Sequence, residues 1–188
     1  MIELPDSQHV WHRGYDGNCK GVYFITICVR GRHELLGQII MRGDHTEKST
    51  RFFTANMQRL LGHDDPETPL VVPSLYGLIA EKHIKSIADD YYGVHVDDYV
   101  IMSNHIHILL TITNRATLQR SSNPSDAFIP RIIKAFKKHA NMEYGFEMWR
   151  VGYHEQKVGS EQEYLELLEF IDSNPLNWRD DEYFVNGA

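Results

Sequence analysis

The sequence has few cysteines and no long apolar run. Its 188 residues include two cysteines, Cys19 and Cys28, and their spacing matches no zinc-binding or redox motif. A reduced, cytoplasmic compartment is therefore the simplest expectation. No apolar run approaches the roughly 20 residues that cross a bilayer, so we expect no membrane association. The first residues lack a basic region followed by an apolar stretch, and we expect no signal peptide there.

Basic residues are outnumbered by acidic ones. The chain has 19 Lys and Arg against 26 Asp and Glu, which gives a formal net charge of −7. Proteins that coat nucleic acid non-specifically depend on many contacts between Lys or Arg and phosphate, so the charge argues against that class. The net charge does not exclude a basic patch on one face of the protein. No internal repeat or low-complexity tract is present, and we expect a single domain over residues 1–188.

Alternating and β-branched patterns predict strands, at residues 23–30, 99–113 and 151–157. Within 99–113, Ser103 and Asn104 interrupt the pattern and predict the turn of a hairpin. Apolar residues at helical spacing predict helices, at residues 75–92, 127–144 and 161–173. Ser74 is the expected N-cap of the first helix. Ser160 and Glu163 have the form of a capping box at the start of the last one.

Two segments lack a sustained period. In residues 44–73 we expect a short helix over 51–61 and a loop in the second half, and in residues 114–126 a connector. Strands interleaved with helices around an antiparallel hairpin predict an α+β fold, with helices packed on a sheet.

The sequence His105-Ile106-His107 is the main candidate for chemistry. Two residues at positions i and i+2 of a strand project from the same face, with their Cα atoms about 6–7 Å apart. Both imidazoles can therefore reach one divalent ion, while Ile106 points into the core. A pair of strand histidines without a ligand is the alternative interpretation.

Two helices carry weaker candidates. Arg131, Lys134 and Lys138 share one face of the helix over 127–144, with Lys137 nearby, and would contact phosphates if the protein binds DNA. A solvated face of an amphipathic helix is the alternative. On the last helix, Glu166, Phe170 and Asn174 lie one turn apart beside the apolar stripe.

Three segments, kept in order, resemble the HUH transposases that use a single tyrosine, including their REP-associated relatives. They are YFITICVRGRHELLG (23–37), VDDYVIMSNHIHILLTI (96–112) and MWRVGYHEQKVGSEQEYLELLEFIDSNPLNWRDDEY (148–183). Residues 102–107, followed by an aliphatic run, are the most specific part. Residues 44–72 match poorly and resemble a family-variable insertion.

The resemblance implies a ferredoxin-like antiparallel sheet of the HUH endonuclease type, with helices on one side. It implies that His105, His107 and Asn174 hold Mg²⁺ or Mn²⁺, and that a tyrosine attacks single-stranded or hairpin DNA to give a 5′-phosphotyrosine. The family includes dimers that exchange the tyrosine helix and also monomers, so a homodimer is one expected state.

At the position of that tyrosine this chain has Phe170, which has no hydroxyl group. Three explanations are open. The protein is a decayed or repurposed transposase that still binds DNA, or the phenylalanine is a deliberate Tyr→Phe change, or another tyrosine such as Tyr164 or Tyr153 substitutes. Besides the transposase hypothesis, a non-catalytic DNA-binding regulator is the main rival. A tyrosine-independent phosphodiesterase with Glu166 as base, and a purely structural protein, are the other two.

Overall fold

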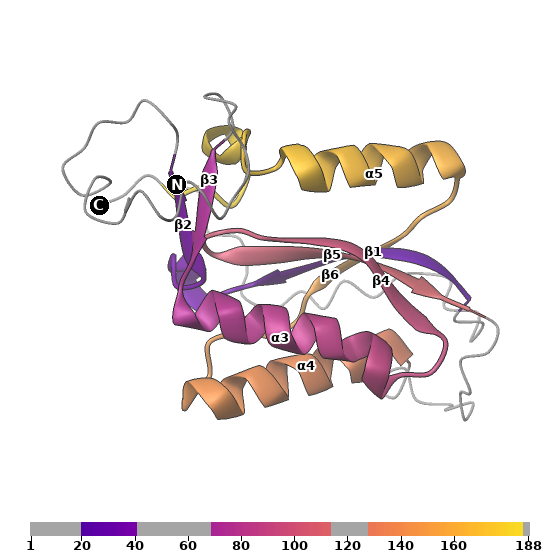
Figure 1. Ribbon diagram of the computed structural model, residues 1–188, viewed down its shortest axis with the longest axis horizontal. Helices are drawn as coiled ribbons and strands as arrows, with labels where there is room; N and C mark the ends of the chain where they lie inside the picture. The colour runs from indigo at the N-terminus through magenta and orange to yellow at the C-terminus, as the bar shows by residue number, and fades with distance from the viewer. Residues whose placement is uncertain (1–19, 41–68, 114–127, 186–188) are drawn as a thin grey trace, which may run out of the picture.

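The structure is a computed structural model, and it describes residues 20–40, 69–113 and 128–185 (Figure 1). Four strands form one antiparallel sheet in the order β4-β5-β1-β6, and two more form a separate ribbon. The sheet strands are β1 (Gly21–Cys28), β4 (Val94–Ile101), β5 (His105–Ile112) and β6 (His154–Lys157), and the ribbon strands are β2 (Gly37–Ile40) and β3 (Leu70–Pro73). The helices are α3 (Leu75–Asp90), α4 (Phe128–Tyr144) and α5 (Glu161–Ser173), with short 3-10 turns η1 (Arg30–Arg32) and η3 (Trp178–Asp180). The expected α+β fold class is confirmed.

The sheet has helices on both faces, whereas the resemblance implied helices on one side; α5 covers the second face because its apolar residues pack on Phe24 and Leu109. Figure 1 shows α3 and α4 side by side along one face and α5 along the other. The even-numbered residues of β5 pack under α3 and α4, against buried residues such as Ile84, Ile132 and Phe136. The odd-numbered residues His105, His107 and Leu109 face the α5 side, where Phe24, Leu109 and Ile171 form a second apolar cluster. Strand β5 is therefore buried on both faces.

The N-caps confirm the expected starts of two helices. The Ser74 hydroxyl accepts a hydrogen bond from the Gly77 amide at 3.2 Å, and the Ser160 hydroxyl accepts one from the Glu163 amide at 3.1 Å. The capping box of α5 differs in one respect. The Glu163 carboxylate accepts from the Gly159 amide at 2.6 Å, one residue before the position expected for a capping box.

The β2–β3 ribbon corrects the prediction for residues 44–73, since a loop was expected up to Pro73. Residues 70–73 instead pair with β2 in antiparallel register. Four-residue strands are too short to show a period, which is why the pattern missed them. The ribbon lies close to α3: a Cβ on Gly77 would stand 2.1 Å from the Leu36 carbonyl oxygen, so only glycine fits there. The helix expected at 51–61 and the connector at 114–126 lie outside the described residues.

Two strand boundaries also differ from the prediction. Strand β4 begins at Val94 rather than at Tyr99, and contains an irregularity between Val96 and Asp98. Strand β6 begins at His154 rather than at Val151, because Gly152 adopts a positive φ of 83° that interrupts the extended chain. In the described part of the chain, no helix combines the length and the apolar character needed to cross a membrane.

The two-sided burial of β5 makes its core side chains sensitive to truncation. We expect Ile108→Ala to lower the free energy of unfolding by about 2–5 kcal/mol, because Ile108 is fully buried between the sheet and the helices. Urea denaturation measures this change. Leu165→Ala on α5 is the control, since Leu165 is 53% exposed and its truncation should cost less than about 1 kcal/mol. Equal losses for the two variants would contradict the assignment of the core.

Candidate metal centre

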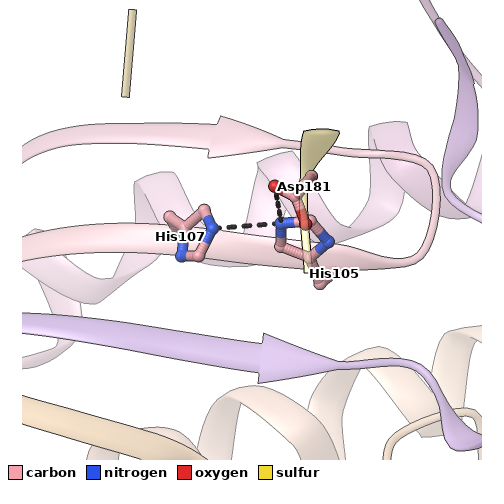
Figure 2. Close-up of side chains that lie close together, drawn as sticks. All are labelled: His105, His107 and Asp181. Atoms are coloured by element: carbon pink, nitrogen blue, oxygen red, sulfur yellow. Dashed lines mark hydrogen bonds and ion pairs between the residues drawn. The ribbon is translucent and has the colours of Figure 1, made fainter. Parts of the chain in front are cut away.

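His105 and His107 point toward each other on the α5 face of the sheet (Figure 2). Their Nε2 atoms lie 3.0 Å apart, and the two side chains are almost completely buried, with residue exposures of 0% and 3%. The convergence follows from the strand itself, because alternate residues of β5 share a face. Two ring nitrogens that meet at this distance share either one proton or one cation.

The Asn104 amide fixes the protonation of the His105 ring. The Asn104 Nδ2 group donates to the carbonyl oxygens of Tyr183 at 2.8 Å and Arg32 at 3.2 Å. Its Oδ1 atom therefore faces His105 Nδ1 at 2.9 Å and can only accept. His105 consequently carries its proton on Nδ1, and in the neutral ring Nε2 presents a lone pair to His107.

Thr26 is the corresponding partner of His107. The Thr26 Oγ1 atom lies 2.8 Å from His107 Nδ1, and Thr26 is itself buried on the neighbouring strand β1. A hydroxyl group can donate or accept, so His107 is able to carry its proton on either nitrogen. When the proton is on Nδ1, both Nε2 atoms present lone pairs, which is the arrangement that binds a metal ion.

Oxygen ligands come from the chain after α5. Asp181 Oδ2 lies 3.8 Å from His105 Nε2, and the candidate ligand atoms of His105, His107 and Asp181 all lie within 4.8 Å of one another (Figure 2). Asn174 is 2% exposed, and its Nδ2 group donates to Asp181 Oδ2 at 3.1 Å. The Asn174 Oδ1 atom is buried and has no hydrogen-bond partner within the described residues.

The electrostatics of this group fit a cation. Burial and the nearby charge of Arg32 together lower the pKa of His105 to about 3. Burial and the neighbouring His105 likewise lower the pKa of His107 to about 3. Both rings are therefore neutral at pH 7, and the Asp181 side chain, only 5% exposed, forms no ion pair with Lys or Arg in the described segments. A buried carboxylate, two lone pairs and an orphaned amide oxygen are together suited to a positive ion.

Aromatic rings cover the pair. The Tyr183 ring centroid lies 4.4 Å from that of His105, the Trp178 ring 6.0 Å from it, and the Phe170 ring 5.2 Å from that of His107. Phe170 also makes an edge contact with Phe24 and is 41% exposed. The position expected for the nucleophile therefore lies beside the histidines, and it presents a hydrocarbon ring.

The two tyrosines considered as substitutes lie elsewhere. Tyr153 packs against the core under α3 and α4, and its hydroxyl donates to Glu155 at 3.1 Å. Tyr164 packs beside the Phe24 and Leu109 cluster, near Asp97 and Asp98 of β4, and burial and these carboxylates raise its pKa. Glu166 is exposed and accepts from Gln162 on the same helix. Tyr183 is the tyrosine that the structure places against His105.

The basic stripe of α4 is not part of this centre. Arg131, Lys134 and Lys138 are exposed on α4, which covers the opposite face of the sheet from the histidines. Lys137 is turned inward instead. Its Nζ donates to the carbonyl oxygens of Arg150 and Gly152, and burial lowers its pKa to about 8.

Sequence reasoning missed Asp181, Tyr183 and Asn104. Asp181 and Tyr183 follow Pro175 in irregular chain, where no periodicity predicts which way a side chain points. Asn104 was identified only as a turn residue. Its position next to His105 in the sequence could have indicated that it hydrogen-bonds the His105 ring. A ligating histidine needs a partner for its other nitrogen, and adjacent Asn is one of few residues within reach.

Comparisons with known proteins support the fold. No family model matches the chain. An uncharacterized protein of Haemophilus influenzae is 26% identical over 92% of this chain and 89% of its own length. A solved structure described as the REP-associated tyrosine transposase bound to a REP hairpin has a TM-score of 0.53 and 14% identity, over 89% of this chain and 73% of that one. A putative transposase from Deinococcus radiodurans has a TM-score of 0.39 and 15% identity, over 87% and 95% of the two chains. The first of these structures shows that the chain has a transposase-like fold.

The buried histidines predict a loss of stability in acid. Each has a folded-state pKa near 3, whereas histidine in an unfolded chain titrates near 6.5. Below about pH 6.5 the unfolded state binds protons that the folded state does not. The free energy of unfolding should therefore fall as the pH decreases toward 3, by up to about 1.4 kcal/mol per pH unit for each histidine.

Urea denaturation between about pH 7 and pH 4, with a chelator present, measures this dependence. The double variant His105→Gln/His107→Gln should show a shallower decline than the wild type, because it lacks both titrating groups while the carboxylates remain. Parallel curves for the two proteins would contradict the burial of neutral imidazoles.

Proposed function

We propose that this chain is a transposase-like protein that holds a divalent cation, Mg²⁺ or Mn²⁺, and binds single-stranded or hairpin DNA beside it. The observation that carries the proposal is the 3.0 Å contact between His105 Nε2 and His107 Nε2, next to the buried Asp181 carboxylate. The fold supports DNA as the partner, because the transposase of similar fold was solved with a REP hairpin.

The donor set supports the identity of the ion. His105 and His107 would each supply Nε2 and Asp181 would supply Oδ2, while Asn174, the ligand expected from sequence, would supply the Oδ1 atom that has no other partner among the described residues. Two imidazole nitrogens with carboxylate and amide oxygens suit Mn²⁺, and also Mg²⁺ with bound water. Bound there, the cation would polarise a phosphate oxygen as a Lewis acid.

The chain's own residues orient this site. Asn104 and Thr26 hold the two rings through their Nδ1 atoms, so that both Nε2 atoms face the same point. Because the histidines are covered, a phosphate reaches them only when the Phe170 or Tyr183 ring moves aside. The exposed Phe170 ring is in turn suited to stack against a base of a single strand.

Phe170 favours the second candidate function, a DNA-binding regulator derived from a transposase. A phenyl ring cannot form the phosphotyrosine that the family resemblance implies. The two candidates share the cation and the DNA. The transposase would cut a DNA strand, whereas the regulator would bind the strand without cutting it.

Calorimetric titration tests the cation site. Mn²⁺ should give a saturable isotherm with the wild type, and His105→Ala should remove it, because this variant keeps only one of the two converging imidazoles. Asp181→Asn should weaken binding by about 10- to 100-fold, as should Asn104→Ala, which removes the partner that orients His105.

Asp180→Asn is the matched control, since Asp180 is the exposed neighbour of Asp181 and should leave the isotherm unchanged. Asn174→Ala should weaken binding if its Oδ1 atom is a ligand. Identical isotherms for the wild type and for His105→Ala would reject the site altogether.

Restoring the hydroxyl tests position 170. Incubated with hairpin-bearing single-stranded DNA and Mn²⁺, Phe170→Tyr should give a covalent protein–DNA adduct visible by denaturing electrophoresis, and the wild type should give none. Phe170→Leu is the apolar control. An adduct formed by the wild type and absent in Tyr183→Phe would instead identify Tyr183 as the nucleophile, and would overturn the assignment of position 170.

A further inference from the structure

Two rows of side chains lead across the sheet from the metal centre to its β6 edge. In one row, His107 of β5 lies opposite Thr26 of β1, and Thr26 lies opposite His154 of β6. Because paired residues of an antiparallel sheet share a face, His154 lies on the same face as His107. Two inter-strand steps of about 4.8 Å place the His154 backbone about 10 Å from that of His107. His154 is exposed.

The second row begins at His105, which lies opposite Cys28. The Arg150 amide donates to the Cys28 carbonyl oxygen at 2.9 Å, beyond the interruption at Gly152. Val29 and Trp149 form the adjoining bridge, and both are buried in the core under the helices. Ile27 and Val29 both lie in that core, so Cys28 between them in the strand faces the metal side. Arg150 lies beside Cys28, where burial raises the pKa of the thiol and the charge of Arg150 lowers it. Arg150 is exposed.

Hydrogen bonds from α4 hold the chain segment that precedes β6 in place. Lys137 of α4 reaches the carbonyl oxygens of Arg150 and Gly152, and it thereby holds the chain between Arg150 and His154. Lys137 therefore stabilises the β6 edge of the sheet and is not part of the exposed α4 stripe.

Arg32 is a third side chain near the metal centre that can donate to a phosphate. Its guanidinium carbon lies 5.5 Å from the Tyr183 ring centroid, and its Nη1 group donates to the Glu182 carbonyl oxygen at 2.9 Å. Arg32 adopts a positive φ of 56°, which costs conformational energy in a residue other than glycine. The charge of Arg32 lowers the pKa of His105, and that of Arg150 lowers the pKa of Cys28, which agrees with their positions around this face.

These three side chains are available for a ligand. Within the described ranges none of them forms an ion pair with a carboxylate, whereas the nearby Arg30 is paired with Glu147 at 3.2 Å. In a chain of net charge −7, two arginines and a histidine left without a carboxylate partner beside a candidate phosphate site are suited to an anionic polymer. Arginine donates to phosphate through a planar fork, and an imidazole can donate through a ring N–H.

We propose that Arg32, Arg150 and His154, which we call the β6-side rim, bind the phosphates of a single DNA strand that runs from the metal centre toward β6. The inference rests on the proposed function and names its DNA-binding surface. It replaces the α4 stripe as the DNA-binding face, because the stripe lies across the sheet from the histidines.

Fluorescence anisotropy with labelled oligothymidine, and with a hairpin bearing a single-stranded extension, tests the rim. Arg150→Gln/His154→Gln should weaken binding by about tenfold for each phosphate that the variant no longer binds. It should also make the slope of log affinity against log salt shallower, by about 0.7 for each phosphate that Arg150 neutralises. Arg131→Gln/Lys134→Gln on α4 is the matched control and should bind like the wild type. All four residues are exposed, and urea denaturation verifies that both variants fold.

The outcomes separate the rim from the proposed function. If the wild type binds both probes and the rim variant binds them with equal affinity and slope, the rim is wrong and the proposed function stands. A loss of binding confined to the α4 variant would likewise overturn the rim and restore the stripe. If the wild type binds neither probe, the proposed function itself fails.

Discussion

Burial of β5 on both faces is the constraint on which the site depends. One face anchors the strand under α3 and α4 through four isoleucine and leucine side chains, and the other carries the two histidines. A shift of one residue in register would exchange the faces and place imidazoles in the apolar core. The packing on the α3 and α4 side therefore fixes where the candidate metal centre lies.

The architecture was largely predictable because its elements are long and periodic. The period of two in residues 99–113 predicted the hairpin and the direction of His105 and His107, and apolar stripes predicted α3, α4 and α5 to within a few residues. The short strands β2 and β3 could not be found in this way, since pairing between distant segments, rather than a local pattern, makes them extended.

The site was predictable only where it lies on regular structure. His105 and His107 come from one strand, so their convergence follows from strand geometry alone. Asp181 lies in the irregular chain after α5, and its approach to His105 is a result of tertiary packing. The β6-side rim depends on the register of three strands and on an interruption at Gly152, and neither can be read from local sequence.

The α4 stripe stays a prediction as a DNA-binding surface, and it illustrates what a charge pattern can and cannot tell. Arg131, Lys134 and Lys138 do share a helix face, and this face is exposed. A helical wheel relates side chains to their own helix axis, and it contains no information about which side of the sheet the helix covers. The structure adds the layer order, with α4 on one side of the sheet and the histidines on the other.

The Thr26 hydroxyl has a consequence for how the centre would take up an ion. Because it can rotate, His107 can move its proton from Nε2 to Nδ1 without changing its charge, and His105 already carries its proton on Nδ1. Ligation at neutral pH would then exchange one uncharged tautomer for another and release no net proton from the imidazoles. The heat of binding would accordingly be the same in buffers of different ionisation enthalpy.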